Sequence, residues 1–431
     1  EPDGFFGAVL AVEGFPGMSA LINGPGGCRS RMQIIIRNLL GTYDGEDPGC
    51  CRSKYFSRQS RLPCTYLNAE DIIFGSGNKI ADGLRSVLTV SPTDTVLIDT
   101  LGASVQVTDR GAAAVRSGHS DRTVLADPDL ASFTCGQGFD RTAAAVIEHW
   151  RPEQGRRARP AVNLLGYSLG DSGWAFGVRG ITELLALMGA DVVACLGCHS
   201  GREEVRASGA ADLNLVIHPE YAAQTAAFYQ KALGLPSLVP AGGAPIGYPA
   251  TRSFLTETAA ALGLDPASAL AAVAAEERAT AGILKNCDKV AGGLHGYGLA
   301  VRGMPSAVLP LVSWLRDWFG LRPAAVGLTE TGGPHEAALR TLLAGCGCTE
   351  ALGSWDLTGC RAVLADGAEA AEAKHSLPEA ACLAIAPPYF EQASFVDRSL
   401  VGTGGARYLL DGLINGQGTF RCGQPTMGDF R

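Results

Sequence analysis

The cysteines of this sequence are the residues best suited to chemistry. The chain of 431 residues contains 13 cysteines, and Cys28, Cys50, Cys51 and Cys64 lie close together in its first part, in or next to turns rich in glycine and proline. Thiolates with no histidine among them favour an iron–sulfur cluster. Structural zinc is the alternative, but its sites usually pair cysteines separated by about two to four residues, and this region has no such pair. We therefore predict that these four cysteines bind a metal cluster; otherwise they are small apolar side chains in a core.

The surroundings of these cysteines also suit a negatively charged cluster. The turn Gly24–Cys28 (GPGGC) frees backbone N–H groups that can hydrogen-bond cluster sulfur, so we predict that Gly26 and Gly27 contact the bound group. Basic side chains nearby would offset part of the negative charge; they are Arg29, Arg31, Arg52, Lys54, Arg58 and Arg61.

A second set of candidate residues follows two predicted strands in the middle of the chain. His218 comes directly after Leu213–Ile217, and Cys198 and His199 follow Asp191–Cys195. Imidazole binds iron or nickel and can act as a general acid, and open α/β sheets bind ligands at the carboxyl ends of their strands. We predict a catalytic role for His218 and cofactor or substrate contacts for Cys198 and His199. The alternatives are a partly exposed loop histidine and a buried Cys195 with no role in binding.

The remaining clustered cysteines carry no such signal. Cys346 and Cys348 form a C-x-C pair without a partner pair, and Cys360 and Cys382 stand alone in the last part of the chain. We predict structural roles for all four.

One pattern recurs along the chain, and it indicates the elements that must position these residues. A short apolar run leads through a glycine- or serine-containing turn into a helical stretch, which is typical of buried parallel strands in βαβ units. The apolar runs are Thr95–Asp99, Ala161–Tyr167, Asp191–Cys195, Leu213–Ile217, Ala324–Thr329 and Arg361–Ala365. The stretch Pro266–Lys285 predicts a long connecting helix.

This recurrence predicts an α/β protein of three Rossmann-like, doubly wound parallel-sheet units, with a cluster or substrate pocket between them. We place the units at residues 1–155, with the cluster ligands, at 156–290, and at 291–431, with C-terminal helices. The first boundary follows the polar stretch Glu153–Pro160, and the second falls near Ala291–Gly303.

Composition excludes several classes of function. A net charge of −8 without a basic stripe argues against nucleic-acid binding. No apolar stretch approaches the roughly 20 residues needed to cross a bilayer, and the start of the sequence lacks the features of a signal peptide. We therefore expect a cytoplasmic, reducing location. The sequence also lacks a GxxxxGK[ST] loop, so any ATP chemistry is expected in another protein.

Five segments resemble the nitrogenase component 1 family, and they occur in the order of that family. They are Gly7–Cys28, Glu70–Gly75 with Lys79, Asn163–Tyr167 with Gly170 and Asp171, Leu213–Val216, and Phe395–Asn415. The resemblance implies that Cys28 binds a bridging iron–sulfur cluster. Asp3 stands where the family has a cysteine and resembles the aspartate ligand of protochlorophyllide reductases, although a plain surface acid is the other interpretation. His218 stands where the nitrogenase α subunit presents its cofactor cysteine.

The same resemblance implies a function. Members receive electrons from a separate iron protein that hydrolyses ATP, and we expect a subunit of such a reductase, with a 4Fe–4S or related cluster and a second metallocofactor as a further option. The substrate is a small molecule or a tetrapyrrole, with dinitrogen the least expected. Alternatives are a scaffold for metallocofactor assembly and a structural partner subunit. Phe395–Asn415 and Gly242–Phe254 look more like a β-type chain, which favours a sister component 1 subunit over a homo-oligomer.

Overall fold

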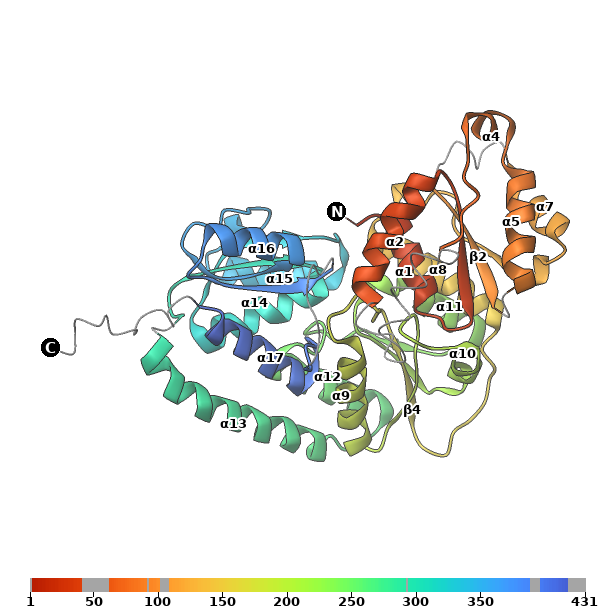
Figure 1. Cartoon of the computed structure of the whole chain (residues 1–431). Helices are drawn as coiled ribbons and strands as arrows, with labels where there is room; N and C mark the ends of the chain where they lie inside the picture. The colour runs from red at the N-terminus through yellow and green to blue at the C-terminus, as the bar shows by residue number, and fades with distance from the viewer. Residues whose placement is uncertain are drawn as a thin grey trace. The chain divides into compact units, whose positions relative to one another are not determined.

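The computed structural model describes residues 2–40, 62–90, 93–100, 108–291, 294–387 and 396–417. Three separate sheets occur in this part of the chain, and every pair of named strands is parallel. Helices flank each sheet (Figure 1). The predicted α/β class with three parallel-sheet units is therefore confirmed.

The chain divides into two compact units, and the first contains two of the sheets. It comprises residues 1–170 and 189–239, and the second comprises residues 171–188 and 240–431. The domain limits at 155/156 and 290/291 remain a proposal.

The first sheet carries the N-terminal cysteines. Its strands run in the order β1 (Met18–Asn23), β2 (Asp94–Asp99), β3 (Thr123–Leu125). The helices of this region are α1 (Gly4–Glu13), α2 (Gly26–Leu40), α4 (Ala69–Phe74), α5 (Gly77–Val90), α7 (Arg110–Ser117) and α8 (Cys135–Trp150). Every residue of β2 is buried, and the apolar face of α5 packs on the sheet through Ile80, Leu84 and Leu88.

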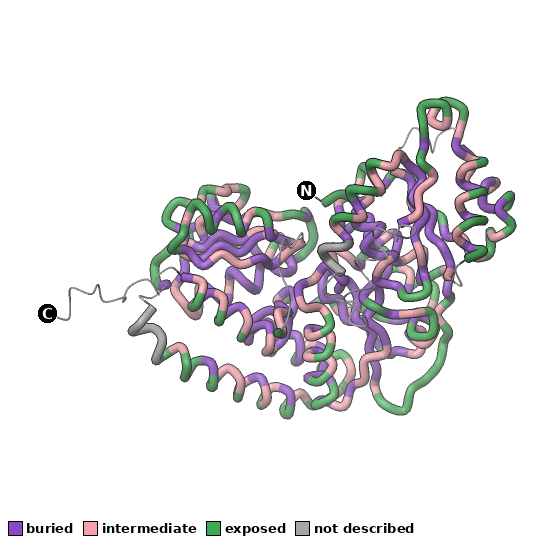
Figure 2. Tube along the Cα trace, in the orientation of Figure 1, coloured by how far each residue is buried: buried purple, intermediate pink, exposed green. Residues whose placement is uncertain are grey.

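The second sheet also lies in the first unit. Its order is β5 (Asp191–Cys195), β4 (Ala161–Leu165), β6 (Leu213–Val216), β7 (Ser237–Leu238), with α10 (Arg202–Ala207) and α11 (Ala223–Leu233) between strands. The central strands β4 and β6 are buried throughout, as Figure 2 shows by the purple of the sheet interiors. Burial on both faces explains why their sequences are continuous apolar runs rather than alternating ones.

The third sheet lies in the second unit, in the order β11 (Ala381–Ala386), β10 (Cys360–Asp366), β8 (Gly298–Gly303), β9 (Arg322–Leu328). The helices of this unit are α9 (Trp174–Leu187), α12 (Gly247–Leu262), α13 (Ala267–Ala291), α14 (Pro305–Phe319), α15 (Gly333–Gly345), α16 (Gly367–Ser376) and α17 (Gly402–Asn415). The long helix predicted over Pro266–Lys285 is present as α13. Strand β8 occupies the stretch that we interpreted as a boundary.

We searched the described helices for a membrane span, and none is both long and apolar enough.

Candidate metal-cluster site

Cys28 lies where the first sheet ends and a helix begins. The turn Gly24–Gly27 leads from the carboxyl end of β1 into α2, and Cys28 is in the first turn of that helix, partly exposed. Its backbone N–H donates to Pro25 O at 3.2 Å. The N-terminus of a helix carries partial positive charge and unpaired N–H groups, so it stabilises a thiolate.

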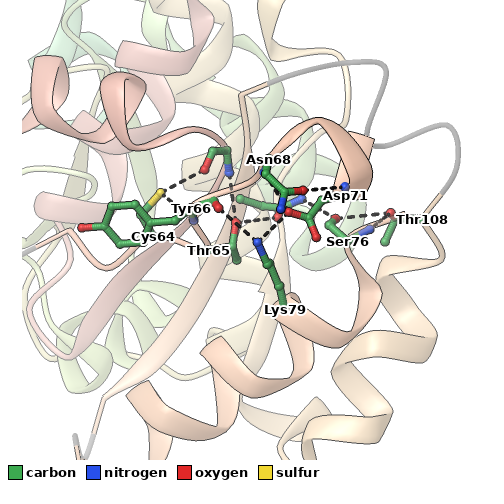
Figure 3. A network of polar contacts seen from close by, with 10 residues as sticks. Cys64, Thr65, Tyr66, Asn68, Asp71, Ser76, Lys79 and Thr108 are labelled. Atoms are coloured by element: carbon green, nitrogen blue, oxygen red, sulfur yellow. Dashed lines mark hydrogen bonds and ion pairs between the residues drawn. The ribbon is translucent and has the colours of Figure 1, made fainter. Parts of the chain in front are cut away.

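Cys64 is brought next to this turn by strand pairing. The segment around it forms a parallel bridge with Ile22 of β1, through Ile22 N to Pro63 O at 2.9 Å and Thr65 N to Ile22 O at 3.0 Å. The Cys64 thiol donates to Gly24 O at 3.1 Å, and its sulfur accepts from Tyr66 N at 3.4 Å (Figure 3). Two of the four predicted ligands are therefore neighbours of one turn.

The electrostatic environment of Cys64 is that of a half-buried thiol beside a cation. Burial raises the pKa of Cys64 above its ordinary value, and the nearby Cys28 thiol raises it further. The Arg29 guanidinium and the hydrogen bonds with Tyr66 and Gly24 oppose this rise in pKa. A metal ion would supply the missing positive charge, because a ligating thiol must lose its proton.

Two polar atoms at this place fit a sulfur-rich group. Thr100 Oγ1 and Arg29 Nε are buried and have no hydrogen-bond partner in the part of the chain that the structure describes. Thr100 follows β2, and its hydroxyl lies so near Gly24 that a methyl group there would be 2.0 Å from it. Cluster sulfides and thiolates are acceptors that can satisfy such donors. The soft donor set of Cys28 and Cys64 and these two orphaned donors fit an iron–sulfur cluster.

The other predicted ligands complete the picture only in part. Cys50 and Cys51 lie outside the described residues, as do Arg52, Lys54, Arg58 and Arg61. Within the described ranges, no three His, Cys, Asp or Glu side chains are arranged to hold a metal ion. Gly26 packs against the ring of Tyr66, whereas a side chain at Gly27 would meet open space.

Asp3 has a structural use. Its Oδ1 accepts a hydrogen bond from Phe6 N at 3.0 Å and caps α1, and the residue is exposed. Capping occupies one carboxylate oxygen.

A polar network that the sequence did not indicate supports both cysteine segments. The Asn23 amide accepts from Thr65 Oγ1 at 2.9 Å and donates to Asp99 Oδ1 at 2.7 Å and to Ser76 Oγ at 3.2 Å. Arg110 holds the other oxygen of Asp99 at 2.7 Å. Burial raises the pKa of Asp99, while Asn23 and Arg110 oppose the rise. Figure 3 shows Thr65 and Ser76 in this network. The available signal was that Asn23 and Asp99 both end apolar strands.

Comparison with known proteins identifies the family. Residues 4–416 match the family described as nitrogenase component 1 type oxidoreductase. This chain belongs to that family. The structure described as "Nitrogenase Cp1 at pH 6.5" has the same fold, with a TM-score of 0.76, 15% sequence identity, and coverage of 99% of this chain and 94% of that one. A second, "Nitrogenase Cp1 at pH 5", gives a TM-score of 0.64 at 14% identity, with 98% and 90% covered.

Curated relatives match over a shorter stretch. A light-independent protochlorophyllide reductase polypeptide of Rhodospirillum rubrum is 37% identical over 113 residues, which is 26% of this chain and 20% of the relative. The polypeptide of the same description from Parasynechococcus marenigrum is 38% identical over 121 residues, 28% of this chain and 22% of the relative. The chain thus spans about a fifth of the length of the curated relatives that it matches.

In this component 1 type chain, the second set of predicted residues lies in the second sheet. His218 directly follows the end of β6 and is 2% exposed, and its ring stacks on Tyr167 with centroids 6.2 Å apart. Cys198 is buried in the turn after β5, and His199 is exposed with a φ of 60°. Cys195 is buried, as the alternative interpretation required. The functional roles of His218, Cys198 and His199 stay predictions.

The four distal cysteines lie in the second unit. Cys346 and Cys348 follow α15, while Cys360 and Cys382 lie in β10 and β11. Burial raises the pKa of Cys360 to about 11, and the neighbouring Asp356 and Cys382 contribute to the rise. Such a thiol is protonated at neutral pH and is a poor metal ligand, which supports the predicted structural role of Cys360.

Proposed function

We propose that this chain is a subunit of a nitrogenase-like reductase that receives electrons from a separate, ATP-dependent iron protein through an iron–sulfur cluster at Cys28 and Cys64. The observation that carries the proposal is the meeting of these two thiols at the N-terminus of α2, beside Arg29 and two buried donors without partners among the described residues. The family match supports the reductase class.

The residues of this chain would hold and tune such a cluster. Cys28 and Cys64 would supply thiolates, and Cys50 and Cys51 are proposed as further ligands. Arg29 and the first N–H groups of α2 offset negative charge. When bound, a 4Fe–4S or related cluster would transfer single electrons at low potential. The Asn23 network fixes the end of β1 against the Cys64 segment, which limits reorganisation on electron transfer.

A tetrapyrrole is the proposed substrate class. The curated relatives are named as parts of a protochlorophyllide reductase, and this name is what favours a tetrapyrrole over other small molecules. We propose His218, with Cys198 and His199, at the substrate or second-cofactor site, because buried imidazole at a strand end can deliver a proton. A sister component 1 subunit, or a second copy of this chain, is the proposed partner, and the proposed location is cytoplasmic.

The decisive measurement is the iron and sulfide content of protein purified without oxygen. We expect the wild-type chain to contain both, and Cys28→Ala to lose most of the iron and most of the visible absorption, since a thiolate ligand is removed. Cys195→Ala is the matched control, because Cys195 is a buried cysteine of the same unit and should leave iron unchanged.

Iron content in Cys28→Ala equal to that of wild type would contradict the cluster assignment. Turnover with an iron protein, ATP and reductant separates the reductase from a cofactor-assembly scaffold, which would carry iron without turnover.

A further inference from the structure

Tyr66 has a backbone conformation that its side chain disfavours. Its φ is 52°, in the left-handed region, where a bulky residue is rare because its Cβ crowds the backbone. A residue stays there only when its surroundings enforce the conformation, and such residues are frequent at functional sites. Tyr66 is also 54% exposed, so burial of its ring does not explain the conformation.

Contacts on several sides hold Tyr66 in place. Arg29 Nη1 donates to the phenol oxygen at 2.7 Å, and its guanidinium lies 5.6 Å from the ring centroid. The ring packs on the start of α2, where a methyl group on Gly26 would be 2.9 Å from Cδ1. Lys79 Nζ donates to Tyr66 O at 3.2 Å and is itself paired with Asp71 at 2.6 Å (Figure 3).

The result of this conformation is an N–H group directed at a sulfur atom. Tyr66 N donates to Cys64 Sγ at 3.4 Å. Both neighbours of Tyr66 are anchored to the β1 region, through Thr65 N to Ile22 O and Leu67 N to Gly24 O, each at 3.0 Å. A change of φ at Tyr66 must therefore be absorbed by the peptide plane that carries this N–H, and the hydrogen bond to sulfur would be lost.

We propose that Tyr66 is a positioning residue for the Cys64 sulfur, whose left-handed backbone keeps an N–H donor on that sulfur. The inference rests on the proposed cluster role of Cys28 and Cys64. An N–H donor to a ligating thiolate favours the more negative, reduced form of a cluster and so raises its reduction potential.

The test compares Tyr66→Gly with Tyr66→Val. Both variants lose the ring and its contact with Arg29, but glycine adopts a positive φ freely and valine does not. The full chain is purified without oxygen, and its cluster is titrated with a redox dye series followed by EPR. We expect Tyr66→Gly to keep the wild-type midpoint potential. Tyr66→Val should shift the reduction equilibrium about tenfold toward the oxidised form, which is about 59 mV more negative for a one-electron couple.

Arg151 provides the matched control. It has a φ of 56° at the end of α8 in the same unit, and its N–H donates to Ile147 O at 3.0 Å. Arg151→Val should lower stability as Tyr66→Val does but leave the potential unchanged. Equal potentials in Tyr66→Gly and Tyr66→Val would overturn the inference, and so would an equal shift in Arg151→Val.

A second readout keeps the two proposals separable. If wild-type protein binds no cluster, the proposed function fails, and the inference is judged on the cluster-free chain by mass spectrometry of Cys64 after timed alkylation with iodoacetamide. Loss of one anchor on the sulfur should make Cys64 react severalfold faster in Tyr66→Val than in Tyr66→Gly. Equal rates would overturn the inference in this case as well.

Discussion

Single side chains at the cluster site differ in how much of their role the surroundings impose. Cys28 is placed by its own turn, which follows β1 directly, and it lies within the start of α2. Cys64 is far from it in sequence, and its place depends on pairing with Ile22 and on the backbone of Tyr66. A cluster bound here would thus have one ligand on a regular helix and one on a segment held by hydrogen bonds.

His218 is the residue on which the second proposed site depends. His218→Gln should lower turnover by about tenfold or more while leaving iron content unchanged, because the amide cannot deliver a proton as imidazole does. His335→Gln is the control, since His335 is equally buried at 2% but lies in the second unit, with Nε2 bonded to Pro240 O at 2.8 Å.

The pair of variants is followed by steady-state turnover and iron analysis. Wild-type turnover in His218→Gln would remove His218 from the site. Loss of both iron and turnover would show instead that His218 stabilises the fold.

At the scale of elements, the helix pair α1 and α8 explains two glycines of the N-terminal region. The helices cross so closely that a methyl group on Gly138 would lie 2.1 Å from Gly4 O, and one on Gly7 would lie 2.0 Å from Cys135 O. Glycine at such a crossing permits backbone contact rather than flexibility. The Gly7-Ala8 segment, which carried part of the family resemblance, is therefore a packing feature.

Gly138→Ala should destabilise the protein by about 3 kcal/mol, because the added methyl forces two backbones apart. Gly180→Ala, in the interior of α9, should stabilise it by about 0.5–1 kcal/mol, since nothing lies within 4 Å of the added group and alanine favours the helix. Urea unfolding of the two variants and the wild type measures both changes. A neutral Gly138→Ala would show that the helices cross less closely.

At the scale of the whole molecule, exposed apolar side chains occur on helices next to the cysteine segments. Ile34 on α2 is 62% exposed, and Ile73 and Phe74 on α4 are 63% and 81% exposed. Only 18% of the residues are charged. Exposed apolar groups at this density mark protein interfaces, and a sister chain would cover them.

We therefore expect the anaerobic protein to have a mass above the 44.7 kDa of one chain in light scattering. Phe74→Glu should move it toward the single-chain mass, because a charge would be buried at the contact. Val115→Glu, at an exposed site on α7, should not. A wild-type chain that is monomeric with its cluster intact would contradict the proposed assembly.

The sequence by itself determined the α/β class and six of the strands. Strands β2, β4, β5, β6, β9 and β10 are continuous apolar runs because parallel strands are covered on both faces. It did not reveal β8, whose Gly298–Gly303 contains two glycines and an arginine and was interpreted as a boundary. Sheet pairing on both sides overrode the weak strand propensity of those residues.

At the site, the sequence determined which residues could act, and tertiary structure decided which of them meet. The GPGGC turn pointed to Cys28 because ligand and helix start are local features. Contact of Cys64 with that turn requires the parallel bridge to Ile22, which no local pattern encodes. The left-handed Tyr66 was equally hidden, since a turn of that kind predicts glycine or asparagine. These features depend on strand pairing and packing between segments distant in sequence, and only the folded chain supplies them.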